Sequence, residues 1–146
     1  SGATGEESAQ VLVLGGGVVG MNATKVALGM GADITILNRS ISERLIKFQK
    51  KHSSQLSIDL STQVNIEQHL SSTDLVIGAV LVAGASAPKL ITRDMLKLMK
   101  KGSVLVDVSI DQGGCFETSK VTTHDKPTYV VDDIIHYCVG NMPGAV

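Results

Sequence analysis

The sequence predicts a single α/β domain, a doubly wound and mostly parallel sheet with helices on both faces. Short aliphatic blocks such as Val11 to Leu14, bounded by Gly, Ser, Asp or Lys, are typical of strands buried on both faces. They alternate with amphipathic segments through short connections, which favours parallel strands joined by right-handed crossovers. With 146 residues, 43% hydrophobic and 18% charged, the chain is long enough for one core and too short for two full domains.

The first predicted unit is a strand, a glycine turn, a helix and a second strand. The strands are Val11 to Leu14 and Ile34 to Leu37, and the helix runs from Val19 to about Gly29. Gly29 and Gly31 suit the end of this helix, because helices often end in a left-handed backbone conformation that glycine adopts at the lowest energetic cost. The preceding Ser1 to Gln10 is small, polar, acidic and without periodicity, so we expect a flexible leader or linker before a domain spanning residues 11–146.

A second helix, about Ile41 to Lys51, is predicted because Ser40 and Glu43 have capping-box spacing and Ile41, Leu45 and Phe48 share one face. The later elements rest on shorter patterns. They are a third strand at Ser57–Leu60, a short helix at Asn65–Leu70, a fourth strand at Leu75–Val80, a helix at Thr92–Met99 capped by Thr92, a fifth strand at Ser103–Val108 and a sixth at Tyr129–Val131. The segment Asp132 to Cys138 is compatible with a helix, for which Asp132 and Asp133 would be a cap.

Composition narrows the range of partners. A net charge of −1 and the absence of Trp leave no basic stripe and few stacking platforms, so we expect no nucleic-acid partner. No apolar run approaches the roughly 18 residues that span a bilayer, and the N-terminus lacks a secretory layout, so we expect no membrane association and a cytoplasmic location. Cys115 and Cys138 lack Cys-x-x-Cys spacing, which favours buried free thiols, and the four histidines lack ligand spacing, so no metal site is predicted.

The motif with the clearest chemical meaning is Gly15-Gly16-Gly17-Val18-Val19-Gly20, a G-x-G-x-x-G between a predicted strand and a predicted helix. In that setting it predicts the first turn of a Rossmann-like dinucleotide-binding unit. Gly15 permits the tight turn, Gly17 lets a pyrophosphate approach the backbone, and Gly20 lets the helix pack closely on the strand. The amides of Val18 and Val19 would meet the pyrophosphate at the positive end of the helix. A glycine turn that serves packing alone stays open as an alternative, whereas a P-loop is excluded because no Gly-Lys-Ser/Thr ending follows.

The end of the second strand bears on the choice between NAD and NADP. NAD-binding domains usually carry Asp or Glu there, whose carboxylate bonds the adenosine ribose and repels a 2′-phosphate. This chain has Asn38, followed by Arg39 and Ser40. An amide lacks the charge that repels a 2′-phosphate, and the guanidinium of Arg39 offers a forked set of donors to phosphate oxygens. We therefore expect the cofactor to be NAD or NADP, and we expect NADP to be tolerated. The alternative is that Arg39 is a solvated surface charge and Asn38 a turn former, and that NAD is bound more weakly. Arg44 and Lys47 add positive charge nearby, although helix surfaces often carry such residues for solubility alone.

Further contacts are expected at the carboxyl ends of the fourth and fifth strands, because dinucleotides bind across the crevice there. Those ends are Gly78 to Leu81 and Val106 to Asp111. Small and aliphatic residues in the first stretch would let the nicotinamide ribose pack on the backbone, although the same stretch also fits plain core. Asp111, ahead of Gly113-Gly114, is the best-placed carboxylate for the reacting end, with a turn-forming aspartate as the alternative.

Longer runs resemble alanine dehydrogenase over nearly the whole chain after the leader, with only Ser53 to Ser72 loosely similar. The runs are Leu75–Val82, Ala87–Leu90, Asp107–Glu117 and Tyr137–Val146. The resemblance implies an enzyme that interconverts L-alanine with pyruvate and ammonia by hydride transfer at C4 of the nicotinamide, with Asp111 as the catalytic aspartate. It also implies cofactor contacts at Val18, Val19, Asn38, Ser61, Val80, Leu81, Val108, Ser109, Ile110, Val139, Asn141 and Met142. The family usually has an aspartate where this chain has Asn38, and this departure leaves the cofactor choice open.

The resemblance further implies a second domain, formed from segments before and after this one, that supplies an arginine, a lysine and a histidine acid/base. We expect that substrate domain to be absent from this chain. L-alanine and pyruvate would then bind only when it is present, and the chain alone would be inactive, because hydride transfer needs the substrate held beside the ring. When full length, the family implies a homo-oligomer, usually a hexamer.

Two alternatives stay open from sequence. One is the nucleotide domain of a nicotinamide nucleotide transhydrogenase, which uses a second dinucleotide instead of an amino acid; the runs Ile110–Cys115 and Asn141–Pro143 favour alanine dehydrogenase over it. The other is a non-catalytic dinucleotide-binding module. Asp111 argues against that reading, because binding alone does not require it.

Overall fold

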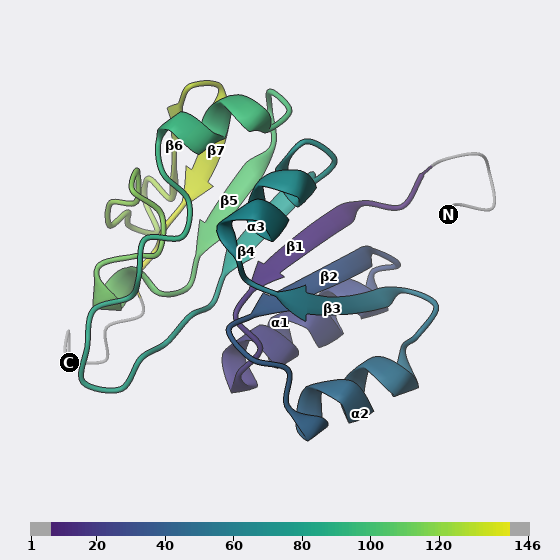
Figure 1. Ribbon diagram of the computed structural model, residues 1–146. Coiled ribbons are helices and arrows are strands. Elements are labelled where there is room, and N and C mark those ends of the chain that lie inside the picture. Colours follow the sequence, from purple (N-terminus) through teal and green to yellow (C-terminus); the bar gives the residue numbers. More distant parts are fainter. Residues whose placement is uncertain (1–6, 141–146) are drawn as a thin grey trace.

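The computed structural model describes residues 7–140, which form a seven-stranded sheet of order β3-β2-β1-β4-β5-β7-β6 (Figure 1). Strand β6 pairs antiparallel with β7, and the other neighbouring strands pair in parallel. The elements are β1 Gln10–Leu14, α1 Val18–Gly29, β2 Asp33–Asn38, α2 Glu43–Lys51, β3 Leu56–Leu60, α3 Gln63–Leu70, β4 Leu75–Gly78, the 3₁₀ helix η1 Asp94–Leu98, β5 Val104–Asp107, the 3₁₀ helix η2 Ile110–Gln112, β6 Thr128–Val131 and β7 Ile134–Tyr137. The predicted class, a doubly wound and mostly parallel α/β sheet, is confirmed.

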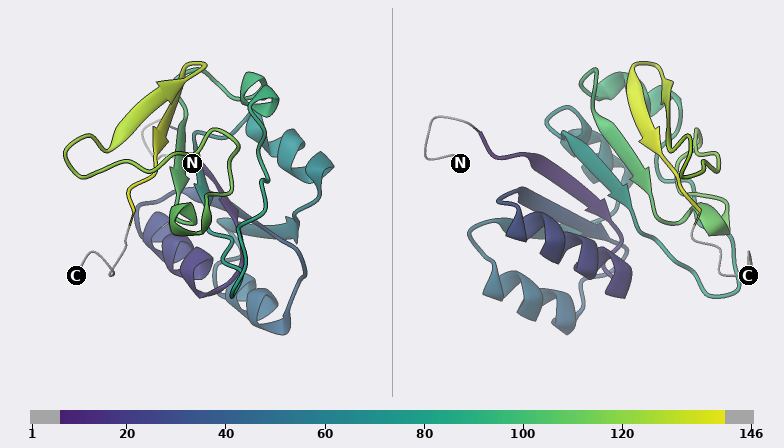
Figure 2. Two further views of the ribbon diagram at one scale, coloured as in Figure 1. Left: turned by 90° about the vertical axis from the view of Figure 1, so that its left-hand side faces the viewer. Right: turned by 180° about the vertical axis from the view of Figure 1, so that it is seen from behind.

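Helices lie on both faces of this sheet (Figure 2). Alternate residues of β1 enter two different cores: Val11 and Val13 belong to a cluster with residues of α1 and α2, whereas Leu12 and Leu14 belong to a cluster with residues of α3 and η1. All four are at most 5% exposed. A strand covered on both faces needs apolar residues at every position, which is why its sequence is a continuous aliphatic block.

The winding of the chain changes direction between β3 and β4. Strands β1, β2 and β3 follow one another outward, and the chain then crosses through α3 to place β4 on the other side of β1, with Leu14 opposite Gly78. The connections that follow β1 and β4 therefore lead away from each other, which opens a crevice at the carboxyl ends of these two strands. The glycine turn that follows β1 lies at this point.

The helix expected over Asp132 to Cys138 is wrong, because this segment turns back and forms β7. Asp132 and Asp133 have φ angles of 50° and 65° between the antiparallel strands β6 and β7. Positive φ at both central positions is the geometry of a tight two-residue hairpin, and aspartate tolerates it better than most residues. The paired acids therefore close a hairpin instead of capping a helix, and the β-branched Ile134 and Ile135 continue as strand.

The start of α2 also differs from the expectation. The helix begins after Ser42, whose hydroxyl accepts the N–H of Leu45 at 3.2 Å, so the capping box of Ser40 and Glu43 is wrong. Ile41 precedes the helix and is 43% exposed, whereas Leu45 lies on the buried face as predicted. Phe48 is also buried, so the later start of the helix removes only Ile41 from the predicted apolar face.

The α-helix expected over Thr92 to Met99 is instead the short 3₁₀ helix η1. The N-cap of η1 is Arg93 and not the predicted Thr92, although the hydroxyl of Thr92 accepts the N–H of Met95 at 3.3 Å. The segment is confined on both sides: Ile91 forms an isolated bridge with Phe116, and Gly102 makes a left-handed turn with φ of 86° before β5. A 3₁₀ helix is the usual short connector in such a space.

The remaining differences concern element ends. Strand β1 begins at Gln10, one residue inside the expected leader, and β4 and β5 end at Gly78 and Asp107, before Val80 and Val108. Gly31 has the left-handed conformation expected at a helix end, with φ of 85°, while Gly29 stays within α1.

Two further findings concern the described residues. Cys115 and Cys138 are buried and unpaired, as predicted. Between residues 7 and 140 we find no helix with the length and apolar character needed to cross a membrane.

Candidate functional site

The turn between β1 and α1 is so closely packed that only glycine fits at two of its positions. Gly15 has φ of 115°, and a Cβ there would lie 2.5 Å from the carbonyl oxygen of Ala79. A Cβ on Gly20 would lie 1.9 Å from the carbonyl oxygen of Gly15. The N–H of Gly15 also donates to the carbonyl of Leu37 at 2.9 Å, which ties the turn to β2. The first turn of α1 is thereby held directly against the end of β1.

Gly17 has a different reason to be glycine. It is exposed, it is the N-cap of α1, and a Cβ built there would meet no atom within 4 Å. The neighbouring protein atoms do not exclude a side chain, so the open space is available to a ligand. The first turn of α1 contains no acidic residue, so the amides of Val18 and Val19 keep their full attraction for an anion.

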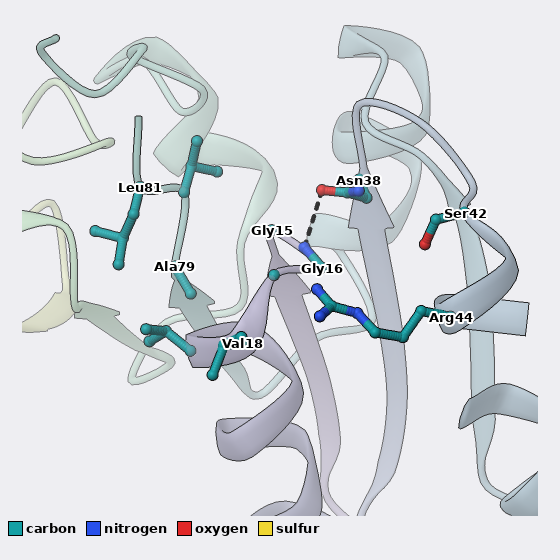
Figure 3. A pocket seen from close by; sticks show the side chains of 11 residues that line it. Gly15, Gly16, Val18, Asn38, Ser42, Arg44, Ala79 and Leu81 are labelled. Atoms are coloured by element: carbon teal, nitrogen blue, oxygen red, sulfur yellow. Dashed lines mark hydrogen bonds between the residues drawn. The ribbon is translucent and has the colours of Figure 1, made fainter. Parts of the chain in front are cut away.

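Asn38, at the end of β2, is bonded to the protein's own backbone (Figure 3). Its Oδ1 accepts the N–H of Gly16 at 2.9 Å, and its Nδ2 donates to the carbonyl of Ser40 at 2.8 Å. Its own carbonyl accepts the N–H of Ser61 at 2.8 Å. The side chain therefore fastens the glycine turn to the loop that precedes α2. A carboxylate could replace the first of the two side-chain bonds but not the second, because it has no N–H to donate.

Two adjoining cavities of about 460 and 590 Å³ form one cleft along the ends of β1, β2 and β4, and they share Gly15, Asn38, Val80 and Leu81. We refer to both cavities together as the crevice. The cavity over the glycine turn also includes the predicted residues Gly17, Val18 and Val19. The second cavity also includes the predicted residues Arg39, Ser40 and Ser61. Volumes of this size are typical of pockets for small molecules and cofactors.

The crevice has a positive character. Among the described residues that line it, only Arg39 and Arg44 are charged, and neither forms an ion pair with another described residue. Arg44 extends from α2 toward the glycine turn (Figure 3), while Arg39 lies beside Ser40 and Ser61. Two arginines without a carboxylate in the same lining favour an anionic ligand with phosphate groups.

The residues predicted after β5 lie outside the lining of the crevice. Asp111 is exposed in η2, directly beyond the strand. Ser109 is fully buried and its hydroxyl donates to the carbonyl of Val80 at 2.8 Å, and Ile110 is 5% exposed, so neither side chain lines a cavity. Val108 is 40% exposed and also lines neither cavity.

The last predicted contacts lie near the end of the described chain. Val139 is half-buried, forms an isolated bridge with Thr122, and lines neither cavity. Asn141 and Met142 lie outside the described residues. The structure therefore gathers the residues predicted around β1, β2 and β4 and leaves those predicted after β5 beside the crevice or undescribed.

The polar groups buried beside β5 and β7 do not supply a nucleophile. Burial raises the pKa of the Cys115 thiol, and the neighbouring Asp107 raises it further, so the thiol stays protonated. Burial also raises the pKa of the Cys138 thiol and lowers the pKa of His136, which favours the neutral imidazole. Within residues 7–140, His, Cys, Asp and Glu form no group of three or more that could hold a metal ion.

Sequence reasoning did not identify several residues that line the crevice. Ser42 was missed because the cap of α2 was placed two residues too early, and the charge of Arg44 was noted without a place in the site. Pro88 and Leu90 reach the second cavity through the long connection after β4. No local pattern marks such residues, because their position depends on the path of the whole loop.

Comparison with known proteins gives consistent results. The family model described as "Alanine dehydrogenase/PNT, C-terminal domain" matches residues 1–146. An alanine dehydrogenase of Halomonas elongata is 59% identical over 145 residues, which cover 99% of this chain and 39% of that protein. Alanine dehydrogenase 2 of Staphylococcus aureus is 50% identical over 146 residues, with coverage of 99% and 39%. The chain thus spans 39% of the length of these relatives.

Solved structures give the same picture. A structure of an L-alanine dehydrogenase is 45% identical, with a TM-score of 0.89, and the match covers 99% of this chain and 40% of that one. A structure of transhydrogenase from Sinorhizobium meliloti is 26% identical, with a TM-score of 0.77 and coverage of 94% and 39%. The sequence and fold of this chain are therefore more similar to the alanine dehydrogenases than to this transhydrogenase.

Proposed function

Because this chain belongs to the family of the C-terminal domain of alanine dehydrogenase and nicotinamide nucleotide transhydrogenase, we propose that it binds a nicotinamide dinucleotide across the crevice as the nucleotide-binding half of an L-alanine dehydrogenase. The observation that carries the proposal is the glycine turn at the end of β1. Its two closely packed glycines, Gly15 and Gly20, hold the start of α1 in place, and Gly17 leaves the approach to that start open. This cradle fits a pyrophosphate, which a side chain at Gly17 would obstruct.

The adenosine half of the dinucleotide is proposed to lie along the β2 side of the second cavity, which Arg39, Ser40 and Ser61 line. The β4 side of the same cavity is left for the nicotinamide half. Asn38 holds the turn through Gly16 and does not carry a negative charge, so nothing in the described lining repels a 2′-phosphate. Arg39 and Arg44 both supply charge complementary to that phosphate. We therefore propose that NADP is accepted alongside NAD. The competing hypothesis is that both arginines are solvated and only NAD binds productively.

At the other half of the dinucleotide, we propose that the nicotinamide lies toward η2, with Asp111 as the catalytic carboxylate. The bound dinucleotide supplies the acceptor or donor of hydride. The contribution of this chain is to hold that group by its backbone and to present a carboxylate at the end of β5. Some of the predicted cofactor contacts would then be made mainly by the backbone, because the side chains do not line the cavities. These are the contacts of Val108, Ser109, Ile110 and Val139 with the dinucleotide.

The activity of the longer protein is a further proposal. It would interconvert L-alanine with pyruvate and ammonia, in the cytoplasm and as a homo-oligomer, using a substrate domain outside these 146 residues. Orientation of the substrate beside the nicotinamide contributes a large share of such a reaction's rate. We therefore expect the purified 146-residue chain to bind dinucleotide and to show no measurable alanine-dependent reduction of NAD or NADP. Robust turnover by the chain alone would contradict this expectation.

Calorimetric titration of NAD and NADP, with the original chain and with Asn38→Asp, tests the cofactor proposal. The new carboxylate would still accept from Gly16 but would repel a 2′-phosphate, so we expect NADP affinity to fall at least about tenfold, or ~1.4 kcal/mol, with little change for NAD. Arg39→Ala should weaken NADP selectively as well. Equal affinities for NADP in all three proteins would show that neither residue reads the phosphate, and absence of binding by either cofactor would contradict the function itself.

The similarity to the transhydrogenase structure from Sinorhizobium meliloti supports a second candidate. A transhydrogenase would exchange hydride with a second dinucleotide, so its activity would not depend on alanine. The 59% identity to an alanine dehydrogenase favours the first proposal over this one. Alanine-dependent reduction of cofactor by a longer form of this protein separates them, because only the first proposal requires it.

A further inference from the structure

Asp107, the last residue of β5, is a buried carboxylate that has no place in the crevice lining. It is 2% exposed, and both of its oxygens are hydrogen-bonded. Oδ1 accepts the N–H of Ser109 at 2.9 Å, while Oδ2 accepts the N–H of Cys115 at 2.9 Å and the hydroxyl of Ser119. Burying a carboxylate is costly unless such bonds compensate for lost water, so its presence in the core calls for a structural or functional reason.

The bonds of Asp107 close a loop around η2. Ser109 and Cys115 are the two ends of the segment that contains Asp111, and one carboxylate holds both. Gly114 makes this closure sterically possible, because a Cβ there would lie 2.7 Å from the Oδ2 of Asp107. Asp107 therefore holds both ends of the segment that contains η2.

The same loop is fastened to the connection that follows β4 and lines the crevice. Ser109 donates its hydroxyl to the carbonyl of Val80 at 2.8 Å, and Gln112 accepts the N–H of Val82 at 3.0 Å through its Oε1. Val80 lines both cavities and Val82 lines the second, in each case on the β4 side, away from Arg39, Ser40 and Ser61. Lys89 adds bonds from its Nζ to the carbonyls of Gly113 and Gly114, at 2.5 and 2.7 Å. The position of η2 is thus linked to the position of the crevice wall.

We propose that Asp107 is the positioning residue of this site: its buried carboxylate sets the place of Asp111 and of the adjoining crevice wall at the nicotinamide end. The inference rests on the proposed function, since it assigns the nicotinamide to that end. Asp107 acts through the loop and does not touch the dinucleotide. Its removal should therefore affect binding of the nicotinamide half and spare binding of the adenosine half.

A comparison of NAD⁺ with ADP-ribose, which lacks the nicotinamide, tests the proposal on this chain. In the original chain we expect NAD⁺ to bind more tightly than ADP-ribose. In Asp107→Asn, one carboxylate oxygen becomes an amide NH2 group, which donates and cannot accept, so the protein donors on one of the two oxygens lose their acceptor. We expect NAD⁺ affinity to fall about tenfold and ADP-ribose affinity to change by less than about twofold. Because both ligands are measured on the same variant, a general loss of folded protein leaves their ratio unchanged.

Two further variants control for stability. Asp74→Asn removes a carboxylate that accepts from the N–H of Gln10 at 2.8 Å and from Lys100 at 2.5 Å, at the opposite end of the sheet. It should lower stability and leave the affinity ratio as it is. If Asp107→Asn does not fold, Ser119→Ala removes one of the three principal donors to Asp107 and should move the ratio in the same direction by a smaller factor.

The possible outcomes are distinct. An unchanged ratio in both Asp107→Asn and Ser119→Ala overturns the inference, as does equal binding of NAD⁺ and ADP-ribose by the original chain. A ratio that shifts as much in Asp74→Asn overturns it too, because the effect would then be general. If the original chain binds neither ligand, the proposed function itself fails.

Discussion

Alanine substitutions in the glycine turn should separate folding from binding. Gly20→Ala places a methyl group 1.9 Å from the carbonyl oxygen of Gly15, which is backbone and cannot rotate away. Cβ atoms in proteins essentially never lie closer than 3.0 Å to such an atom, so helix α1 has to move by about 1 Å to relieve the contact. In an open helix position the same change would stabilise by up to about 1 kcal/mol. Here overpacking costs about 1–3 kcal/mol, so we expect a net loss in the free energy of unfolding.

Gly17→Ala should do the reverse. The added methyl group meets no protein atom within 4 Å, so the change in stability should stay below about 1 kcal/mol, the ordinary effect at an N-cap. The methyl group would occupy the space through which a pyrophosphate approaches the amides of α1. We expect dinucleotide affinity to fall at least about tenfold, or ~1.4 kcal/mol.

Urea unfolding and calorimetric titration with NAD and NADP measure the two effects. Gly29→Ala is the matched control, because Gly29 is also in α1 and a Cβ there meets no atom within 4 Å. It should unfold at the same or higher urea concentration and bind normally. If Gly20→Ala is as stable as Gly29→Ala, the packing argument is wrong. If Gly17→Ala binds as tightly as the original chain, the turn does not hold the pyrophosphate.

Three other predictions concern the core. Phe116 is fully buried, so Phe116→Ala should lower the free energy of unfolding in urea by about 3–5 kcal/mol. Burial lowers the pKa of His136 below the 6.5 of an unfolded histidine, so the unfolded state binds the proton more readily. The stability that the neutral His136 contributes should be fully present above pH 6.5 and should be lost as the pH falls through the lowered pKa. In His136→Gln, urea unfolding measured across this pH range should lack that part of the pH dependence. Burial raises the pKa of Cys115 and Cys138, so neither should react with a thiol reagent at pH 8 until the protein unfolds, and rapid labelling of the native protein would contradict this.

The half of the fold built by β1, α1 and β2 could be predicted from sequence because its determinants are local. The aliphatic block of β1, the glycine turn and the left-handed Gly31 each act on neighbouring residues, and the structure places them as expected. The β6–β7 hairpin could not be predicted in the same way. An aspartate pair before an apolar run suits both a helix cap and a tight hairpin, and only pairing with β5 and β6 decides between them.

In the candidate site, too, residues in local sequence patterns could be predicted, whereas residues that depend on distant contacts could not. That the glycine motif and Asn38 line one cavity could be predicted, because they belong to a contiguous strand-turn-helix pattern and to the end of the next strand. Asp107 was not found, because its partners Cys115 and Ser119 follow 8 and 12 residues later and meet it only through the fold of the loop. In the sequence, a buried carboxylate in an apolar strand appears only as a polar residue that interrupts the apolar pattern. That interruption does not show which hydrogen-bond donors will surround the carboxylate.

Asn38 shows why cofactor choice can change without loss of the pyrophosphate site. The backbone of the turn holds the pyrophosphate, and the contribution of Asn38 to that turn is a single acceptor atom for the N–H of Gly16, which an aspartate would also provide. Both Asn38→Asp and Asn38→Ala lose the bond to the carbonyl of Ser40. Beyond that shared loss, Asn38→Asp adds a charge and should weaken NADP alone. Asn38→Ala removes the acceptor of Gly16 and should weaken NAD and NADP to a similar degree, by an amount typical of one hydrogen bond, about 1 kcal/mol. If Asn38→Ala leaves both affinities intact, the turn does not depend on this bond. A preferential loss of NADP in Asn38→Ala would instead mean that the amide contacts the 2′-phosphate directly.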